Sequence, residues 1–292
     1  MQNKIMCGLT KPISGKLGLA RFAVFALALQ AMVFQSRAQY TLTDGNSQAQ
    51  IDPSTQLGTY SWTVDGQDQL YQQWFWYRVG TVNPESSIDT ISTPTVSSTA
   101  ANNLTTTYAN NSFSIKVLYT LQGGAAGSGV ADMSEQITIN NTSGASLNFH
   151  FFQYVDFDLA GDPPNDTVQL GKNLSGLFNE ARQTDGLRAL SETVDTPGAN
   201  HAEANVYPNT LNKLNDGAPT VLSDNAGPVG PDNVTWAFQW DINLTASGTG
   251  SSFVIGKQKH LDVGQVPEPS ALAIIALGLI ACLLRTTTRQ RA

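Results

Sequence analysis

Cysteine is almost absent from this chain of 292 residues. The sequence contains only Cys7 and Cys282, one near each end. The segment between residues 39 and 265 contains none, so no disulfide bond can form within it and a buried core must stabilise it alone. A segment of this length is large enough to bury such a core.

Basic residues are also scarce between residues 39 and 265. This segment contains eight lysines and arginines against 22 aspartates and glutamates, which gives a net charge of −14. A surface of this charge repels nucleic acids and anionic lipids, so we expect no nucleic-acid partner. Divalent cations or basic partners would be attracted instead.

Motifs that carry catalysis are missing from the same segment. It has no Gly-x-Ser-x-Gly nucleophile elbow, no HExxH sequence and no paired Cys/His spacing for a metal. Its histidines are isolated in the sequence, at His150, His201 and His260. Two carboxylates from distant strands can hydrolyse a glycosidic bond, but among 22 acidic residues a chance pair is uninformative. We therefore expect no enzyme activity.

No convincing helical pattern appears before the C-terminus, where a single apolar run occurs. The run from Ala271 to Leu284 has no polar face and would be about 21 Å long as a helix, shorter than the roughly 30 Å of a bilayer core. Flanking residues extend the span to about residues 269–288. Basic residues that stop a membrane helix follow the run, at Arg285, Arg289 and Arg291. We predict a transmembrane helix rather than a terminal core helix.

Directly before this run stand Pro267, Glu268 and Pro269. A Pro-Glu-Pro tripeptide, an apolar segment and a basic end, in this order, resemble the PEP-CTERM sorting signal of bacterial surface proteins, which a membrane enzyme called an exosortase handles. The resemblance implies cleavage close to the tripeptide and transfer to the cell surface or into extracellular polysaccharide. It implies no activity for the rest of the chain, because these proteins do not share one.

The N-terminus has the pattern of a secretory signal peptide. A basic leader that ends at Arg21 precedes an apolar segment from Phe22 to Phe34. Ser36 and Ala38 place small residues at the −3 and −1 positions of a cleavage site. We predict cleavage after Ala38, with an uncleaved anchor as the alternative.

The two ends together divide the chain into three parts. Residues 1–38 form the predicted signal peptide, residues 39–265 an ectodomain, and residues 266–292 the sorting signal with its transmembrane helix. Because the terminal arginines stay on the cytoplasmic side, the ectodomain is expected outside the cytoplasm.

The ectodomain alternates between apolar and polar residues with a period of two. In Val234–Leu244 every even position is apolar and four of the five odd positions are polar, and Phe113–Leu121 repeats the pattern. Such alternation is typical of half-buried strands. Many short strands separated by turns predict an all-β fold, namely an antiparallel β-sandwich of Ig-like or jelly-roll-like type. Further strands are expected at residues 58–64, 70–79, 135–140, 147–159, 188–194, 201–207 and 252–257.

Two groups of residues are candidate binding sites. Trp74 and Trp76 share one face of an expected strand and would form a platform for stacking sugars if that face were exposed; the alternative is a strand buried on both faces. Four carboxylates around a turn are candidate ligands for a calcium ion, and their alternative is a polar strand face that runs into a solvated turn. They are Asp156, Asp158, Asp162 and Asp166.

These observations predict an exported surface or extracellular-matrix protein that an exosortase sorts. Its expected role is structural or adhesive within exopolysaccharide, without a cofactor except calcium at the four aspartates. A carbohydrate-binding module of the same matrix is the first alternative, and a secreted hydrolase is the second.

Overall fold

The structure is a computed structural model that describes residues 39–246, 248 and 250–264. No helix within these ranges is long and apolar enough to cross a membrane. The predicted signal peptide and sorting signal lie outside the described residues. The predictions that fall there concern Ala38, Pro267, Glu268, Pro269, Arg285, Arg289 and Arg291.

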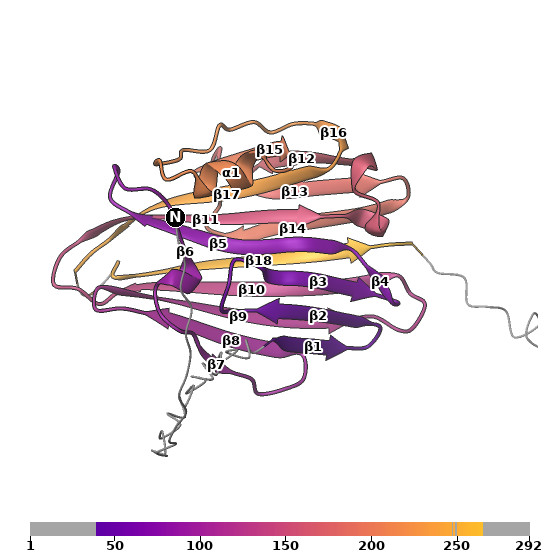
Figure 1. Cartoon of the computed structure of the whole chain (residues 1–292), viewed down its shortest axis with the longest axis horizontal. Helices are drawn as coiled ribbons and strands as arrows, with labels where there is room; N and C mark the ends of the chain where they lie inside the picture. The colour runs from indigo at the N-terminus through magenta and orange to yellow at the C-terminus, as the bar shows by residue number, and fades with distance from the viewer. Residues whose placement is uncertain (1–38, 247, 249, 265–292) are drawn as a thin grey trace, which may run out of the picture. The chain divides into compact units, whose positions relative to one another are not determined.

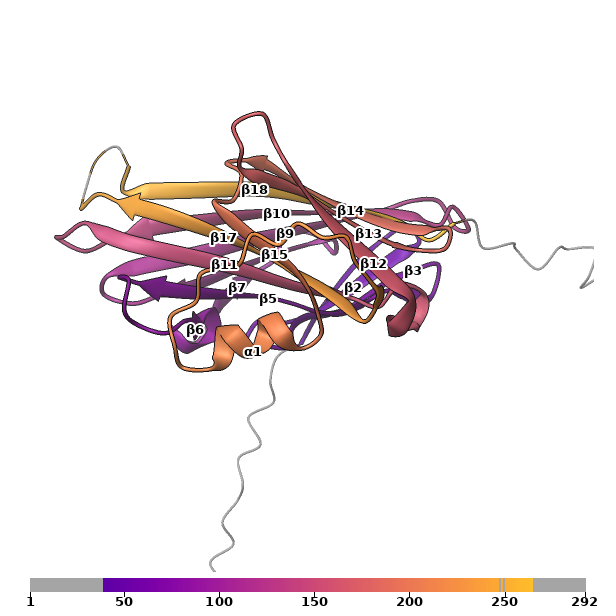
Figure 2. The ribbon, with the colours of Figure 1, turned by 90° about the horizontal axis from the view of Figure 1, so that it is seen from above.

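The described chain forms two nine-stranded sheets that stack face to face (Figures 1 and 2). The first sheet, in spatial order, consists of β1 (Tyr40–Asp44), β2 (Ser47–Asp52), β3 (Gly58–Val64), β5 (Leu70–Val79), β11 (Leu147–Phe157), β17 (Val234–Leu244) and β15 (His201–Val206). Two short strands pair beside this path, β4 (Gln67–Asp68) with β3 and β6 (Ser86–Ser87) with β5. Neighbouring strands run antiparallel, except for β3 and β5, which pair in parallel.

The second sheet is antiparallel throughout its pairings. In spatial order it consists of β16 (Val229–Asp232), β12 (Asp166–Lys172), β13 (Phe178–Asp185), β14 (Arg188–Thr196), β18 (Ser252–Asp262), β10 (Val130–Asn141), β9 (Phe113–Gly123), β8 (Asn103–Ala109) and β7 (Thr95–Ser97). The helical elements are short: η1 (Ile88–Thr90), η2 (Leu159–Gly161), η3 (Pro163–Asn165) and α1 (Asn209–Asn215). Figure 2 shows α1 on the side of the first sheet that faces away from the second sheet.

The prediction of an antiparallel all-β sandwich is confirmed, and every expected strand is present. The finer expectation of an Ig-like or jelly-roll-like sandwich is wrong. Those sandwiches contain about seven to nine strands in total, whereas here each sheet has nine. The sequence analysis missed β1, β2, β8, β12 and β13, and also the short strands β4, β6, β7 and β16. A signal for the first two exists, because Gly45-Asn46 is a typical two-residue hairpin loop, and Gly45 has a φ of 51°.

The core lies between the two sheets and contains both aromatic rings and charges. Phe157 and Trp236 stack with an interplanar angle of 8°, and Phe75 stacks on Phe151 at 22°. Next to these rings, β18 contributes two lysines that are 1% exposed. Buried charges at this depth require partners with opposite charge.

Four charged side chains of the second sheet form what we call the buried ion cluster: Glu135, Glu192, Lys257 and Lys259. The Lys257 ammonium contacts Glu135 and lies 3.3 Å from Glu192, and the Lys259 ammonium lies 2.9 Å from Glu135 and 3.4 Å from Glu192. Burial lowers the pKa of Lys257, and the positive charge of Lys259 lowers it further. The cluster carries two charges of each sign, so it is neutral as a unit.

The first sheet completes the hydrogen bonds of this cluster. Gln73 of β5 donates to Glu135, and Gln153 of β11 donates to Glu192 over 2.8 Å. The Trp236 indole of β17 donates to Glu192 over 3.1 Å. The cluster therefore connects three strands of one sheet to three strands of the other.

We predict that Lys257→Met lowers the free energy of unfolding by about 3–5 kcal/mol, because it leaves buried carboxylates without their counter-charge. Urea unfolding followed by tryptophan fluorescence measures the loss. Lys116→Met is the matched control, since Lys116 is exposed on β9 of the same sheet and should change stability by less than about 0.5 kcal/mol. Equal losses in the two variants would contradict a stabilising role for the cluster.

Candidate functional site

Trp74 and Trp76 lie on the same face of β5, as the alternation predicts, but neither is exposed. Both are 0% exposed. The Trp74 indole donates to the Ser87 hydroxyl over 2.7 Å, and the Trp76 indole lies 3.3 Å from Asn215 at the end of α1. The prediction that these two tryptophans form an exposed stacking platform is therefore wrong. The alternative, a strand buried on both faces, is correct because later segments of the chain cover the outer face of the first sheet.

The exposed aromatic side chains lie elsewhere. Within the described ranges, the only exposed phenylalanine, tyrosine or tryptophan side chains are Tyr71 (54%) and Tyr207 (38%). Their rings pack edge to face with centroids 6.1 Å apart, although 136 residues separate them in the sequence. Two exposed aromatic rings in contact form a small apolar surface of the kind that marks binding sites.

A β-bulge explains why the sequence pattern misplaced Tyr71. Alternation along β5 predicts Tyr71 on the face of Phe75, which is buried between the sheets. In the structure Gln72 pairs with Asp156 and Leu70 pairs with Phe157, so the pairing skips Tyr71. The extra residue reverses the direction of the side chains, and Leu70 is buried in place of Tyr71.

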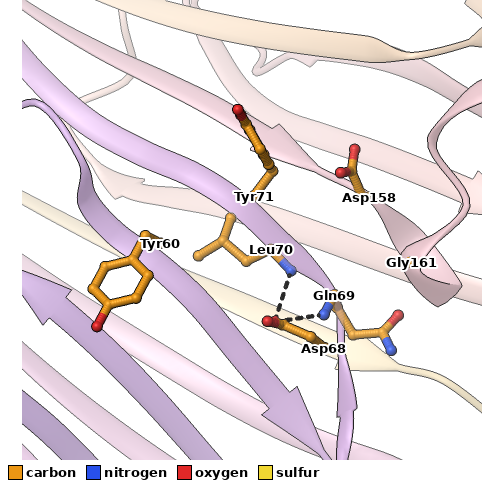
Figure 3. Close-up of a pocket in the computed structure, with 7 residues that line it drawn as sticks. All are labelled: Tyr60, Asp68, Gln69, Leu70, Tyr71, Asp158 and Gly161. Carbon is orange, nitrogen blue, oxygen red and sulfur yellow. Dashed lines mark hydrogen bonds between the residues drawn. The ribbon is translucent and has the colours of Figure 1, made fainter.

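Beside Tyr71 lies a surface pocket of about 210 Å³, which we call the tyrosine pocket (Figure 3). The first sheet supplies most of its wall, and the turn after β11 supplies the rest. Carboxylates and aromatic rings thus line the same pocket. Its lining residues are Tyr60, Asp68, Gln69, Leu70, Tyr71, Asp158 and Gly161.

Two of these lining residues accept hydrogen bonds from backbone N–H groups around the pocket. Asp68 Oδ1 accepts from the backbone N–H of Trp62 and of Gln69, over 3.0 and 2.9 Å. Gln69 Oε1 accepts from the backbone N–H of Ala160 over 2.8 Å, and Ala160 has a φ of 68°. An alanine in the left-handed region costs free energy, so this bond helps to hold the turn at Asp158 in a strained conformation.

Two polar atoms of the pocket residues have no hydrogen-bond partner. They are Asp158 Oδ1 and Gln69 Nε2, and both atoms are buried. Burial raises the pKa of Asp158, and the negative charge of Asp68 raises it further. Both atoms are thus polar groups inside the fold that no residue described in the structure satisfies.

The four aspartates proposed for calcium separate into different environments. Asp156 and Asp166 are 0% exposed, whereas Asp162 is exposed and accepts a bond from Asn165 over 3.0 Å. In the part of the chain that the structure describes, no three His, Cys, Asp or Glu side chains are grouped so that they could hold a metal ion. The calcium hypothesis stays a prediction and gains no support from this geometry.

Burial is the main influence on the pKa of the two innermost carboxyl groups, Asp156 and Asp166. It raises the pKa of Asp156 to about 8, with a further contribution from the charge of Asp158. Burial likewise raises the pKa of Asp166 to about 7, against the lowering effect of hydrogen bonds from Leu159 and Gln183. Both groups are thus neutral acids in mildly acidic solution.

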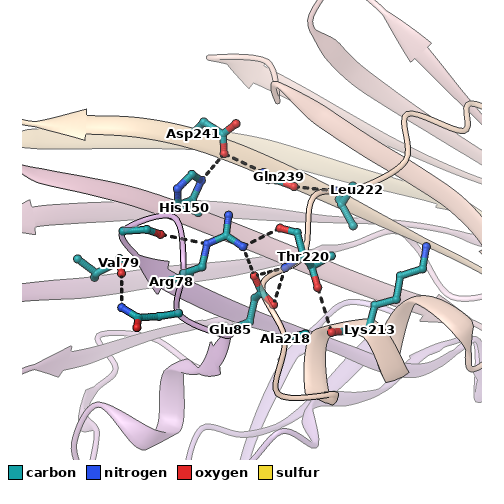
Figure 4. A network of polar contacts seen from close by, with 12 residues as sticks. Arg78, Val79, Glu85, His150, Lys213, Ala218, Thr220, Leu222, Gln239 and Asp241 are labelled. Atoms are coloured by element: carbon teal, nitrogen blue, oxygen red, sulfur yellow. Dashed lines mark hydrogen bonds and ion pairs between the residues drawn. The ribbon is translucent and has the colours of Figure 1, made fainter.

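A second polar network lies on the outer face of the first sheet (Figure 4). The Arg78 guanidinium is 2.5 Å from Glu85 and donates to the Thr220 carbonyl over 2.7 Å. Glu85 accepts from the Thr220 backbone N–H over 2.9 Å. These bonds attach the segment after α1 to β5.

The histidines, isolated in the sequence, each lie beside a carboxylate in the structure. His150 Nδ1 lies 2.6 Å from Asp241, and His201 Nε2 lies 3.5 Å from the other oxygen of Asp241. His260 lies 2.8 Å from Asp132. The second ring nitrogen of His150 lies 2.7 Å from Asn148, so both of its nitrogens have polar partners. The sequence carries no signal for the contact of His150 with Asp241 across β11 and β17.

Residues 265–290 match the model of the PEP-CTERM protein-sorting motif. The chain carries a PEP-CTERM sorting motif. This motif implies an exported protein that an exosortase processes, which confirms the resemblance stated from the sequence. No curated protein matches the chain.

Solved structures show similarity of fold to sugar-related proteins. A putative aldose 1-epimerase from Escherichia coli K12 is 12% identical with a TM-score of 0.53, and the match covers 78% of this chain and 99% of that one. A galactose mutarotase related enzyme from Lactobacillus acidophilus is 9% identical with a TM-score of 0.52, covering 79% and 99%. A bacterial glucoamylase in complex with acarbose is 8% identical with a TM-score of 0.54, covering 84% of this chain and 34% of the glucoamylase. At these identities the similarity concerns the fold alone.

We predict that the protein loses stability as the pH rises from 4 to 8. An aspartate has a pKa of about 3.9 in an unfolded chain, and here the folded values are raised. The stabilising contribution is complete below the unfolded pKa, falls as the pH rises between the unfolded and the folded values, and is lost once the pH has passed about 7 for Asp166 and about 8 for Asp156. Thermal unfolding at both pH values measures the change in Tm.

Asp156→Asn should reduce this loss, because an amide imitates the neutral acid and does not ionise. Asp162→Asn is the matched control, since Asp162 is exposed and should leave the pH dependence unchanged. A pH profile that is the same in the wild type and in Asp156→Asn would show that this carboxyl group does not ionise in the range.

Proposed function

We propose that this protein binds extracellular polysaccharide after export and sorting through its PEP-CTERM tail, and that its role in the matrix is structural or adhesive rather than enzymatic. The observation that carries the proposal is the contact between the two exposed tyrosines, Tyr71 and Tyr207, beside a pocket that contains carboxylates. The site differs from the tryptophan pair expected from the sequence, but the class of ligand is the same.

The chemistry of the tyrosine pocket suits a sugar. Aromatic rings pack against the C–H faces of a pyranose, and carboxylate oxygens accept hydrogen bonds from its hydroxyl groups. The similarity of fold to an aldose 1-epimerase and to a glucoamylase supports the proposal, because proteins of this architecture include ones named for acting on sugars.

Glycoside hydrolysis at the same pocket is the second candidate function. One observation favours it: Asp158, whose pKa is raised by burial, shares the pocket with Asp68, and such a pair can supply an acid and a base. Three backbone N–H groups already bond to one oxygen of Asp68, which favours a positioning role for this carboxylate. Release of reducing ends from the bound polysaccharide would decide in favour of hydrolysis.

We predict that Tyr71→Ala and Tyr207→Ala each weaken binding to exopolysaccharide from the host bacterium roughly tenfold, because loss of one stacking ring costs about 1–1.5 kcal/mol. Co-sedimentation of the full-length protein in detergent with the polysaccharide measures the affinity. Leu174→Ala is the control, since Leu174 is fully exposed in the turn between β12 and β13. Unchanged binding in both tyrosine variants would refute the proposed site.

The sorting step has a separate test in the host bacterium. Deletion of residues 267–292 should remove the membrane-bound precursor and change the distribution of the protein between cell fractions. Mass spectrometry of the surface-located wild-type protein should find a C-terminus that lacks Arg289 to Ala292. An intact C-terminus on that product would exclude processing at the tail.

A further inference from the structure

The tyrosine pocket is negatively charged throughout. Its ionisable lining consists of Asp68, Asp158 and two tyrosines, and none of the lysines and arginines that the structure describes lines it. Three of the eight basic residues in the ectodomain are buried in ion pairs, at Arg78, Lys257 and Lys259. Among the residues that the structure describes, no lysine or arginine therefore serves as a counter-charge to the carboxylates of the pocket.

The two carboxylates line one pocket with no basic side chain beside them in the part of the chain that the structure describes. Burial raises the pKa of Asp158, and the negative charge of Asp68 raises it further. A cation in the pocket would offset the like charge of these two groups, and a charged donor forms a strong hydrogen bond to a carboxylate.

Tyr71 restricts the shape of that cation. Its exposed ring lines the pocket, and an aromatic face attracts a positive charge through its quadrupole and packs against a flat apolar surface. A pyranose ring that carries an ammonium group satisfies both requirements in one residue. The Tyr207 ring stands at 82° to the Tyr71 ring and supports it edge to face.

We propose that the tyrosine pocket recognises an amino sugar whose amino group is free and protonated, within a polysaccharide that is at least partly de-N-acetylated. Asp158 accepts a hydrogen bond from the ammonium group, and Asp68 adds charge at the same pocket. Tyr71 stacks on the sugar ring, and Tyr207 supports the Tyr71 ring edge to face. This inference rests on the proposed function and names the class of sugar that the site takes.

The experiment compares three oligosaccharides of equal length with the full-length protein in detergent at pH 6, where the amine is protonated. They are a β-1,4-linked glucosamine oligomer, its N-acetylated counterpart and a cellulose oligomer. Isothermal titration calorimetry should show at least tenfold tighter binding of the glucosamine oligomer. Asp158→Asn should remove most of that preference, whereas Asp162→Asn, with the same change of charge four residues away, should retain it.

Two further measurements distinguish specific recognition of the amino sugar from general attraction of cations to an acidic protein. Tyr71→Ala should weaken binding of the glucosamine oligomer about tenfold, which attraction by net charge alone would not produce. Oligolysine should bind weakly and without dependence on Tyr71. Tyr71-dependent binding of oligolysine as tight as that of the glucosamine oligomer would overturn the inference, because the ammonium and not the sugar would then be the determinant.

Failure of the inference differs from failure of the proposed function. If the N-acetylated or cellulose oligomer binds as tightly as the glucosamine oligomer and depends on Tyr71, the pocket binds sugars but the amine is not recognised. If none of the three oligosaccharides binds, the inference is refuted, whereas the proposed function is decided by co-sedimentation with the polysaccharide of the host bacterium. If Asp158→Asn keeps the preference for the amine, the carboxylate assigned here is not its partner.

Discussion

The alignment of the two sheets depends on the buried ion cluster. Lys257 and Lys259 extend from β18 into a space that water does not reach, and ammonium groups there require carboxylates and hydrogen-bond acceptors at close range. Glu135 and Glu192 supply the charge, and side chains of the opposite sheet supply the remaining bonds. An apolar interface tolerates sliding, but a cluster of directional bonds holds the sheets at one relative position. We regard this fixing of the relative position of the two sheets as the main contribution of the cluster to the fold.

The same alignment determines which part of the first sheet is free to bind a ligand. The middle of β5 and β11 is closed on its outer face by η1, α1 and the segment after α1, through the bonds of Trp74, Trp76 and Arg78. At the other end of these strands the bulge at Tyr71 and the turn at Ala160 leave the surface open. Tyr207, at the end of β15, meets Tyr71 there. The candidate site is therefore located where the covering segments stop.

Much of the fold was predictable because strands leave a local signal. Val234–Leu244 and Phe113–Leu121 alternate with one interruption each, at Ala237 and Leu118, and both are strands with the expected apolar faces inside. The first seven residues of β17 are buried on both faces, which the alternation did not predict. The candidate site was less predictable. Trp74 and Trp76 have the composition of a sugar platform, but their burial depends on contacts with Ser87 and Asn215, the second of which is 139 residues away. His150 and Asp241 are likewise joined only by the pairing of β11 with β17.

The sequence by itself determined the sorting motif and the class of the fold, because both are written in consecutive residues: the Pro-Glu-Pro tripeptide with its apolar run in one case, and alternation along each strand in the other. Only the tertiary structure decided the exposure of each aromatic ring, the state of each buried acid and the position of the pocket. Tyr71 and Asp158 show the reason. A single bulge reverses one side chain, and the charge of Asp68 acts across space on a residue 90 positions away. Burial and electrostatic interaction depend on what surrounds a residue, and the surroundings come from distant parts of the chain.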